Sequence, residues 1–212
     1  CRNSGLSAES LIIKRAFDIL LSALGCIVTS PIMLITALCI KLYDGGPVFY
    51  TQDRLTRDGK VFKVYKFRSM KTDAEKDGVA RLAGEHDDRI TPVGRVIRKV
   101  RIDELPQLLN ILKGDMSIVG PRPERPELAS ENEKIMPEFR YRLKVKAGLT
   151  GYAQVLGKYN TTPYDKLRLD LMYIEQYSLL LDIKLILMTI KILFIPESTE
   201  GVKDDNTSGT AL

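Results

Sequence analysis

The chain has 212 residues, 44% of them hydrophobic and 28% charged, and its formal net charge is +5. This length suits one catalytic domain with a real core, with or without segments in a membrane. Nucleic-acid binding is disfavoured, because there is no Trp and no helix-turn-helix, zinc-finger or aromatic-basic pattern. The cysteines, Cys1, Cys26 and Cys39, offer neither a metal spacing nor an even disulfide framework, so we expect a reducing, cytosol-facing protein. Because the first residue is Cys rather than Met, we expect a portion of a longer protein.

Residues 19–40 carry no charge. As one continuous helix they would extend about 33 Å, enough to cross a hydrocarbon core of about 30 Å. Pro31 interrupts this segment, since it has no N–H and frees the carbonyl of Ile27. The hydroxyl of Ser30 can satisfy one freed backbone group inside a membrane.

Broken at Pro31, the segment becomes two arms of about 18 and 15 Å, each reaching halfway through the hydrocarbon. This geometry predicts a re-entrant helix-break-helix whose ends return to one face, and the flanking Lys14, Arg15 and Lys41 are compatible with a cytosolic location of both ends. A kinked spanning helix and a buried core helix are the alternatives. The predicted organisation is an extension at 1–10, the re-entrant helix at 11–42, a catalytic domain on the cytosolic face at 43–197 and a flexible tail at 198–212.

A β-hairpin is predicted after the apolar segment. Val48 to Gln52 and Val61 to Arg68 have strand character around the turn residues Asp58-Gly59. Lys66 and Arg68 share one face at the end of the second strand, where they can meet phosphate or simply face solvent. The polar stretch from Thr72 to Asp88, which includes the only histidine, His86, is predicted to be a mobile loop.

An acidic pair, Asp103-Glu104, comes next, directly before a short helix that Pro106 starts and Gly114 ends. Such a pair usually only caps a helix. Here Arg98 precedes it, and Arg122 follows it in a rigid turn between two prolines, which suits a preorganised clamp on phosphate. The setting therefore favours chemistry on phosphate over simple capping.

The later part of the chain is predicted to be mainly helical, with helices from about Glu124 to Glu133 and from about Pro163 to Ser178. Four basic residues and no acidic one lie between Arg140 and Lys146, which suits phosphates of ligands or of anionic lipids. Gly148 to Gly151 is predicted to be a turn whose glycines allow close approach of a ligand. Leu179 to Ile195 is apolar but regularly interrupted by polar residues, so it should lie on the membrane surface or the domain. The fold class is thus α+β and mainly helical, with a re-entrant membrane helix, a small β-hairpin and amphipathic surface helices.

No dinucleotide-binding, Walker, nucleophile-elbow or His-rich metal motif is present, so carboxylates and basic residues must carry any catalysis. Taken together, the ordered motifs resemble those of the bacterial sugar transferases, the monotopic phosphoglycosyl transferases. The motifs that carry this resemblance are Lys14-Arg15-Ala16-Phe17-Asp18, Ser30-Pro31, Lys66-Phe67-Arg68-Ser69-Met70, Asp103-Glu104-Leu105-Pro106-Gln107, Gly114-Asp115-Met116-Ser117, Val119 to Pro123, and Gly148 to Val155.

The resemblance implies transfer of a phosphosugar from a UDP-sugar to polyprenyl phosphate, with release of UMP, at the cytosolic face of the bacterial inner membrane. It implies that Asp103 is the nucleophile and a ligand of Mg²⁺, and that Glu104 is its acid-base or phosphate-positioning partner. Lys66, Arg98 and Arg122 match positions around the phosphates. Ala147 departs from the family pattern, because many members have Pro before the glycine.

Physical reasoning agrees with these roles, since a carboxylate is a competent phosphoryl nucleophile when it is ionised and cations neutralise the phosphates. A helix start favours that ionised form. Two alternatives stay open: a lipid-linked glycosyltransferase that releases UDP, and a non-catalytic membrane scaffold in polysaccharide assembly. The expected partners are a UDP-sugar, polyprenyl phosphate and membrane lipids, and a homo-oligomer is compatible with the sequence.

Overall fold

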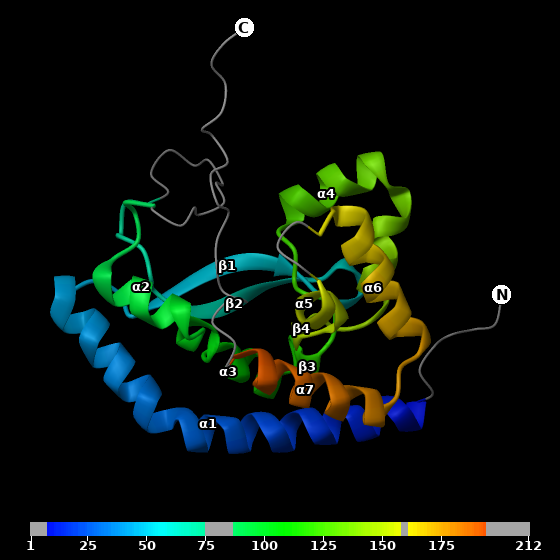
Figure 1. Ribbon diagram of the computed structural model, residues 1–212, viewed down its shortest axis with the longest axis horizontal. Helices are drawn as coiled ribbons and strands as arrows, with labels where there is room; N and C mark the ends of the chain where they lie inside the picture. The colour runs from blue at the N-terminus through cyan, green and yellow to red at the C-terminus, as the bar shows by residue number, and fades with distance from the viewer. Residues whose placement is uncertain (1–7, 75–86, 158–160, 194–212) are drawn as a thin grey trace, which may run out of the picture.

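A single long helix, α1 (Ala8–Asp44), runs beneath the rest of the structure (Figure 1). The computed structural model describes residues 8–74, 87–157 and 161–193. Most of the loop predicted from Thr72 to Asp88, including His86, and the tail predicted at 198–212 lie outside the described residues. The elements after α1 are, in chain order, β1 (Phe49–Leu55), η1 (Arg57–Gly59), β2 (Val61–Phe67), α2 (Pro92–Lys99), η2 (Ile102–Glu104), α3 (Gln107–Lys113), β3 (Ser117–Val119), α4 (Pro126–Ile135), η3 (Pro137–Lys144), β4 (Gly148–Thr150), α5 (Tyr152–Leu156), α6 (Pro163–Glu175) and α7 (Leu179–Leu193).

Helix α1 passes through Pro31 without a non-helical break, and Figure 1 shows it curving toward its C-terminal end. The hydroxyl of Ser30 donates to the carbonyl of Ile27 at 2.8 Å, which confirms the compensation expected at the proline. Thr29 donates in the same way to Gly25 at 2.8 Å. Since Pro31 removes one backbone donor and its ring crowds the preceding turn, a bend is a sufficient response. The two-arm helix-break-helix predicted from the sequence is therefore a single bent helix.

The predicted hairpin is confirmed. Strands β1 and β2 pair antiparallel from Phe49 opposite Phe67 to Leu55 opposite Val61. The turn between them contains Asp58 with φ 60° and Gly59 with φ 75°, a left-handed backbone that Asp and Gly tolerate better than most residues. This turn chemistry fixes the register and thereby the position of the polar residues at the end of β2.

The stretch Gly148 to Gly151 was predicted to be a turn, and this prediction is wrong: it contains strand β4, which pairs parallel with β3. A Cβ on Gly120 would lie 2.4 Å from the carbonyl oxygen of Lys146, and one on Gly148 would lie 2.1 Å from the Gly120 nitrogen. The glycines thus allow two backbones to approach each other, which the sequence pattern does not distinguish from approach to a ligand. The helices predicted near α4 and α6 are confirmed within a few residues at each end.

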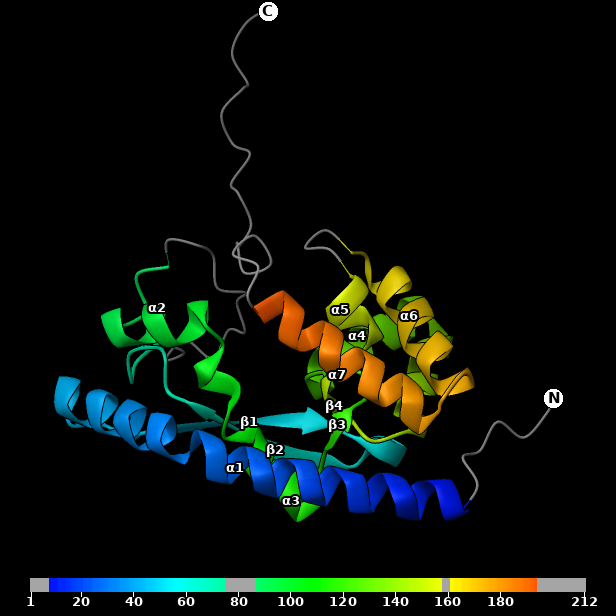
Figure 2. The same ribbon diagram turned by 60° about the horizontal axis from the view of Figure 1, so that its bottom comes forward.

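The main core lies between the hairpin, α3, β3, α6 and α7, which are gathered against α1 (Figure 2). Its most deeply buried side chains come from all five of these elements. They include Val64, Ile111, Met116, Val119, Tyr173 and Leu185. A second cluster of Ile40, Phe67 and Ile97 attaches the C-terminal end of α1 to the hairpin and α2.

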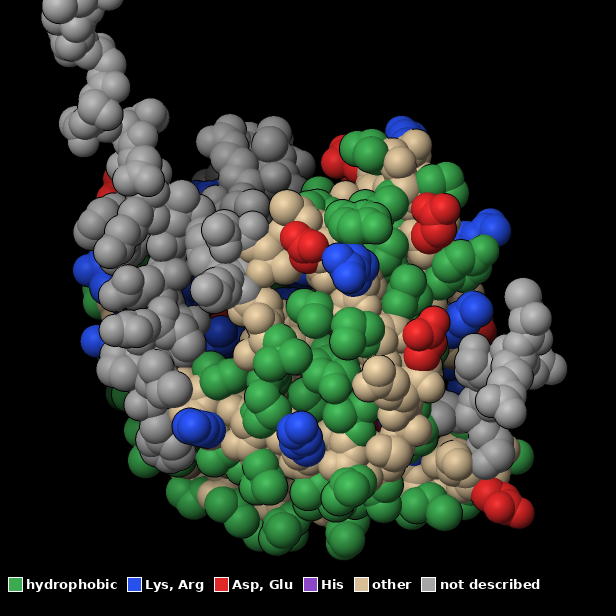
Figure 3. Space-filling view, turned by 45° about the vertical axis from the view of Figure 1, so that its right-hand side comes forward, with side chains coloured by type: hydrophobic (Ala, Val, Ile, Leu, Met, Phe, Trp, Pro, Cys, Tyr) green, Lys and Arg blue, Asp and Glu red, His purple; other side chains and the backbone are tan. Residues whose placement is uncertain are grey.

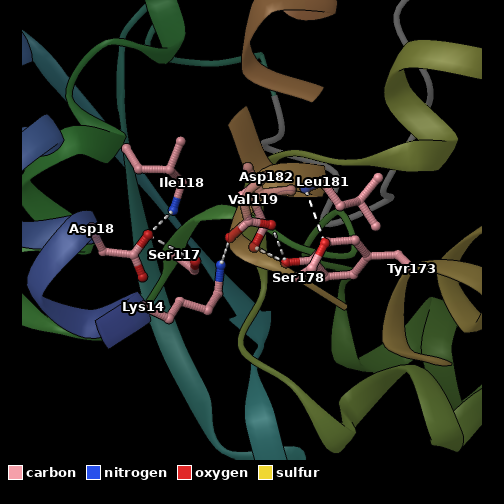
Figure 4. A network of polar contacts seen from close by, with 9 residues as sticks. All are labelled: Lys14, Asp18, Ser117, Ile118, Val119, Tyr173, Ser178, Leu181 and Asp182. Atoms are coloured by element: carbon pink, nitrogen blue, oxygen red, sulfur yellow. Dashed lines mark hydrogen bonds and ion pairs between the residues drawn. The ribbon is translucent and has the colours of Figure 1, made fainter. Parts of the chain in front are cut away.

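A buried polar network attaches the N-terminal part of α1 to β3 and α7 (Figure 4). Lys14 donates to Asp182 at 2.7 Å, and the other oxygen of Asp182 accepts from the hydroxyl of Tyr173 at 2.8 Å. Asp18 accepts from the hydroxyl of Ser117 at 3.0 Å and from the backbone N–H of Ile118 at 2.9 Å. Because these charges are buried and partnered, the network positions α1 against the domain.

Candidate active site

The acidic pair lies in η2, directly after an unusual backbone turn. Helix α2 ends at Lys99, and Arg101 adopts φ 56°, a left-handed conformation that is uncommon for a residue with a side chain. Hydrogen bonds from Arg101 N to the Arg98 carbonyl and from Glu104 N to the Arg101 carbonyl, 3.1 and 3.2 Å long, close the turn. Strained backbone of this kind is concentrated at functional sites. The turn delivers Asp103 and Glu104 beside the end of β2.

Glu104 is the centre of a cationic cluster. One of its carboxylate oxygens accepts from Lys66 at 2.8 Å and from Arg122 at 2.9 Å. Burial opposes ionisation of this carboxyl group, but the charges of Arg122 and Lys66 outweigh it and hold the pKa of Glu104 well below its usual range. Glu104 is therefore an anion at neutral pH, and it fixes two cations that come from distant parts of the chain.

Asp103 differs from its neighbour, because no hydrogen-bond or ion-pair partner is found for it among the residues that the structure describes. Burial and, secondarily, the charge of Glu104 raise the pKa of Asp103, while Lys66, Arg98 and Arg122 act in the opposite direction. The sequence suggested the reverse, a carboxylate favoured by a helix start, but η2 is a single turn and desolvation dominates. The result is a half-buried carboxyl group, surrounded by cations and free to contact a ligand.

Four of the predicted basic and acidic positions thus come together with Asp103: Lys66 from β2, Arg98 from α2, Glu104 from η2 and Arg122 from the loop after β3. Arg68 does not join them and instead pairs with Asp44 at the end of α1. Arg68 is 6% exposed, and its guanidinium lies against Gly46. This pair fastens the end of α1 to β2, and a contact between Arg68 and substrate phosphate stays a prediction.

Two further arginines hold the backbone of the Arg122 loop. Arg54 donates to the carbonyl of Pro123 at 3.1 Å, and Arg142 donates to the carbonyl of Arg122 itself at 3.0 Å. The flanking prolines limit the loop's conformations, and these two hydrogen bonds select one of them. The Arg122 side chain is 46% exposed, and it projects from a fixed backbone toward solvent and Glu104.

Arg142 is itself held in a buried charge network that reasoning from the sequence missed. It lies 2.8 Å from Asp170 and 3.3 Å from Glu124, and its guanidinium stacks 4.7 Å from the ring of Phe139. The stretch Arg140 to Lys146 was noted only as a basic surface. One sequence signal could have indicated a buried partner for Asp170. Asp170 lies between Leu167 and Tyr173 on the buried face of α6, where an unpaired charge would be costly.

A family model described as bacterial sugar transferase matches residues 9–196, nearly the whole described chain. The chain belongs to the bacterial sugar transferase family. This membership agrees with the resemblance seen in the ordered motifs.

Relatives of this bacterial sugar transferase carry specific names. The UDP-N-acetylgalactosamine-undecaprenyl-phosphate N-acetylgalactosaminephosphotransferase of Aeromonas hydrophila is 44% identical over 182 residues, 84% of this chain and 43% of that protein. The UDP-glucose:undecaprenyl-phosphate glucose-1-phosphate transferase of Escherichia coli (strain K12) is 41% identical over 190 residues, 87% of this chain and 41% of that protein. The exopolysaccharide production protein PSS of Rhizobium leguminosarum bv. phaseoli is 39% identical over 200 residues, 90% of this chain and 98% of that protein. The chain spans less than half the length of the first two relatives.

The acidic residues near η2 offer few ligands for a metal ion. Within residues 8–74, 87–157 and 161–193 there is no group of three or more His, Cys, Asp or Glu side chains that would form an all-protein site. Glu104 is occupied by Lys66 and Arg122, which leaves Asp103 as the available ligand. Mg²⁺ in phosphoryl-transfer sites is commonly held by one or two carboxylates, with phosphates and water completing its shell. The donor set is thus compatible with Mg²⁺ only when a phosphate ligand is present.

Proposed function

We propose that this bacterial sugar transferase is a phosphoglycosyl transferase. It moves a sugar 1-phosphate from a UDP-sugar to polyprenyl phosphate and releases UMP, as an early membrane step in the assembly of a bacterial polysaccharide or glycan. The names of its relatives support the substrate classes. The observation that carries the proposal is the pairing pattern of the site: Asp103 has no partner among the residues that the structure describes, while Glu104 binds Lys66 and Arg122 beside it.

In the first proposed step, an oxygen of Asp103 attacks the sugar-linked phosphorus of the UDP-sugar. A bond forms between that oxygen and phosphorus, the bond from phosphorus to the bridging oxygen breaks, and UMP leaves with the electron pair. Lys66, Arg98 and Arg122 lower the repulsion between the anionic nucleophile and the diphosphate. They also oppose the rise in the pKa of Asp103 that burial and Glu104 cause.

In the second step, an oxygen of polyprenyl phosphate attacks the same phosphorus, and the Asp103 carboxylate leaves. The product is a polyprenyl diphosphate sugar, and the enzyme returns to its starting state. Glu104 serves as a positioning residue in this scheme, since its two ion pairs and strongly lowered pKa make it a poor proton donor. It holds Lys66 and Arg122 in place next to Asp103.

Magnesium is the proposed cofactor, with Asp103 as its protein ligand. When bound, the ion would neutralise charge on the diphosphate and on the leaving UMP. Removal of divalent cations with EDTA should abolish UMP release, and added Mg²⁺ should restore it. Full turnover in metal-free buffer would refute the magnesium requirement without affecting the role of Asp103.

The proposed membrane arrangement is a re-entrant α1 in the bacterial inner membrane, with the active site on the cytosolic face. By length and composition α1 is apolar enough to cross a membrane. Support for re-entry comes from its two ends, since Lys14 pairs with Asp182 and Asp44 pairs with Arg68, both in the same domain. A helix whose ends are attached to one domain has its termini on one side of the bilayer.

The surface also supports membrane association. Figure 3 shows hydrophobic side chains gathered along the edge formed by α1. Helix α7 adds an exposed apolar stripe, spaced as one face of a helix, that consists of Leu180, Ile183, Leu187 and Ile190. Lys184 and Lys191 lie in the same helix and suit anionic headgroups. We place α7 on the membrane surface beside α1.

Two experiments test these proposals. The purified protein is incubated with a panel of UDP-sugars and undecaprenyl phosphate, and the nucleotide product is identified: UMP is expected, and UDP would favour an ordinary lipid-linked glycosyltransferase.

For topology, single cysteines introduced before and after α1 are labelled from each side of sealed vesicles. Labelling from the same side is expected, and labelling from opposite sides would exclude re-entry.

A further inference from the structure

Arg142 connects helix α6 to the loop that carries Arg122 through a single nitrogen atom. Its terminal nitrogen Nη2 lies 2.8 Å from the carboxylate of Asp170 and donates to the carbonyl oxygen of Arg122 at 3.0 Å. This nitrogen carries two hydrogens, so it can serve both partners at once. The carboxylate on α6 and the backbone of the Arg122 loop are therefore joined by direct polar contacts that share one atom.

The rest of the Arg142 guanidinium is held as well. Its other terminal nitrogen, Nη1, lies 3.3 Å from the carboxylate of Glu124, farther along the same loop. Its central carbon lies 4.7 Å from the centroid of the Phe139 ring, and Arg142 as a whole is 5% exposed. A rigid, planar group thus contacts the loop at two points from a buried position, which an ammonium group on a flexible stem does not reproduce.

The guanidinium end of Arg122 is held separately, on the side of the candidate active site. It donates to the Glu104 oxygen that also accepts from Lys66. The backbone of Arg122 is thus fixed by Arg142, and its charged end is bound to Glu104. A shift of the Arg122 carbonyl would change where the guanidinium lies beside Asp103, and small displacements of a charged group in an active site lower the reaction rate strongly.

The charge of Asp170 is not explained by stability. Asp170 is 1% exposed, and burial raises its pKa to about 6 although Arg142 acts to lower it. A carboxyl group whose pKa is higher in the folded state than in the unfolded state weakens folding when it is ionised. Buried ion pairs also add little net stability compared with apolar residues of similar size. Orientation of Arg142 is a role for this charge that does not depend on stability.

We propose that Asp170 is a positioning residue for the transfer reaction: through Arg142 it holds the Arg122 loop in the geometry that places the Arg122 guanidinium beside Asp103. The inference rests on the proposed function, in which Arg122 acts on the phosphates of the UDP-sugar. Within the described residues Asp170 has no direct contact with Asp103, so its effect on the reaction passes through Arg142.

The first test is a double-mutant cycle on UMP release. Asp170→Asn keeps the size of the side chain but removes the charge that orients Arg142. We expect kcat to fall about 10- to 100-fold, with the KM for the UDP-sugar nearly unchanged. In an Arg122→Ala background the same substitution should cause no further loss, because the group that it positions is absent. Equal losses in both backgrounds, or full activity of Asp170→Asn, would overturn the proposal.

Glu175→Gln is the matched control, because Glu175 is an exposed acidic residue at the end of the same helix. It should leave both kinetic constants unchanged. Arg142→Lys is the second variant, and it serves if Asp170→Asn does not fold. It keeps a cation beside Asp170 but loses the planar fork that reaches the loop. Its loss of kcat should also disappear in the Arg122→Ala background, and an additive loss would count against the proposal.

The second test does not depend on turnover. Hydrogen–deuterium exchange is followed by mass spectrometry in the wild type and in Asp170→Asn. We expect faster exchange in the peptide that covers residues 119–125 and unchanged exchange in the peptide that covers α3. Unchanged exchange of the loop peptide would refute the positioning role. If the loop exchanges faster while no UDP-sugar yields UMP, the proposed function fails and the link from Asp170 to the loop stands. If UMP is released and Asp170→Asn is fully active, only the positioning role fails.

Discussion

Two lysine–carboxylate clusters in this protein resemble each other in composition and differ in completeness. In the network beneath α7, Lys14 pairs with Asp182, and the second oxygen of Asp182 accepts from Tyr173. In the site at η2, Lys66 pairs with Glu104, but the adjacent Asp103 has no partner among the described residues. The first cluster is closed and nearly inaccessible, and the second keeps one carboxyl group available.

The difference separates a structural role from a chemical one. A buried charge that is fully partnered is what folding requires, because leaving it unpaired costs several kcal/mol. Asp103 is different: its carboxyl group is half-buried, has a raised pKa and lies among three cations that it does not bind directly. The fold does not need such a group. It is the arrangement expected where a ligand supplies the missing contact.

Asp103→Asn should produce the largest effect on this comparison. We expect a loss of UMP release on the order of 10³-fold or more, because the variant has no anionic oxygen to attack phosphorus. The melting temperature should stay close to that of the wild type, since no folded contact is lost. Asp53→Asn, at an exposed aspartate of β1, serves as the control for both measurements. An Asp103→Asn enzyme that retained its turnover would remove Asp103 as the nucleophile.

Asp182→Ala should have the opposite signature. It leaves the buried ammonium group of Lys14 unpaired, so the free energy of unfolding should fall by about 3–5 kcal/mol in chemical denaturation. The matched comparison is Asp53→Ala, which breaks an exposed pair with Lys63 and should change stability little. Equal stability of the two variants would show that the α1 network does not support the fold.

Arg122→Ala should reduce turnover by about 10²–10³-fold with little change in melting temperature, because its guanidinium is half exposed and its backbone is held by Arg142. Activity and denaturation are measured side by side. Arg140→Ala, at an exposed arginine in η3, provides the control. Proportional losses of activity and stability in Arg122→Ala would assign the residue to the fold instead.

The smallest effect concerns Asp170. Burial raises its pKa to about 6, although Arg142 acts to lower it. Since the folded state then binds a proton at higher pH than the unfolded state, the Asp170 contribution to stability should rise as pH falls from about 7 to about 4. Relative to Asp170→Asn, which cannot titrate, the wild type should gain up to about 3 kcal/mol over this range. A difference that stays constant with pH would show that Arg142 keeps the carboxylate ionised.

Much of this architecture follows from local sequence signals. The hairpin around Asp58-Gly59 and the helix that Gly114 ends, with φ 99°, depend on turn and capping chemistry that is visible in short windows. The pairing of β3 with β4 was missed, because it joins residues about thirty positions apart through glycines that also suit a turn. The bend at Pro31 was overestimated as a break, since the sequence does not show how well neighbouring contacts support a helix across one missing hydrogen bond.

The candidate site, like the fold, was predicted from the sequence only in part. The motif order placed Lys66, Arg98 and Arg122 near Asp103, and the structure brings them together. It could not show that Glu104 takes the ion pairs and leaves Asp103 free, because that depends on side-chain positions across three elements. For the same reason the supporting contact of Arg142 with the Arg122 loop was not visible in a single run of basic residues.

The most direct measurement of the account is the intact mass of the protein after incubation with its UDP-sugar and Mg²⁺ in the absence of polyprenyl phosphate. We predict one equivalent of UMP per protein and a mass increase equal to one phosphosugar, located by fragmentation on Asp103 and discharged when undecaprenyl phosphate is added. No adduct, with UMP released only when both substrates are present, or an adduct on another residue would contradict the role assigned to the unpaired carboxylate.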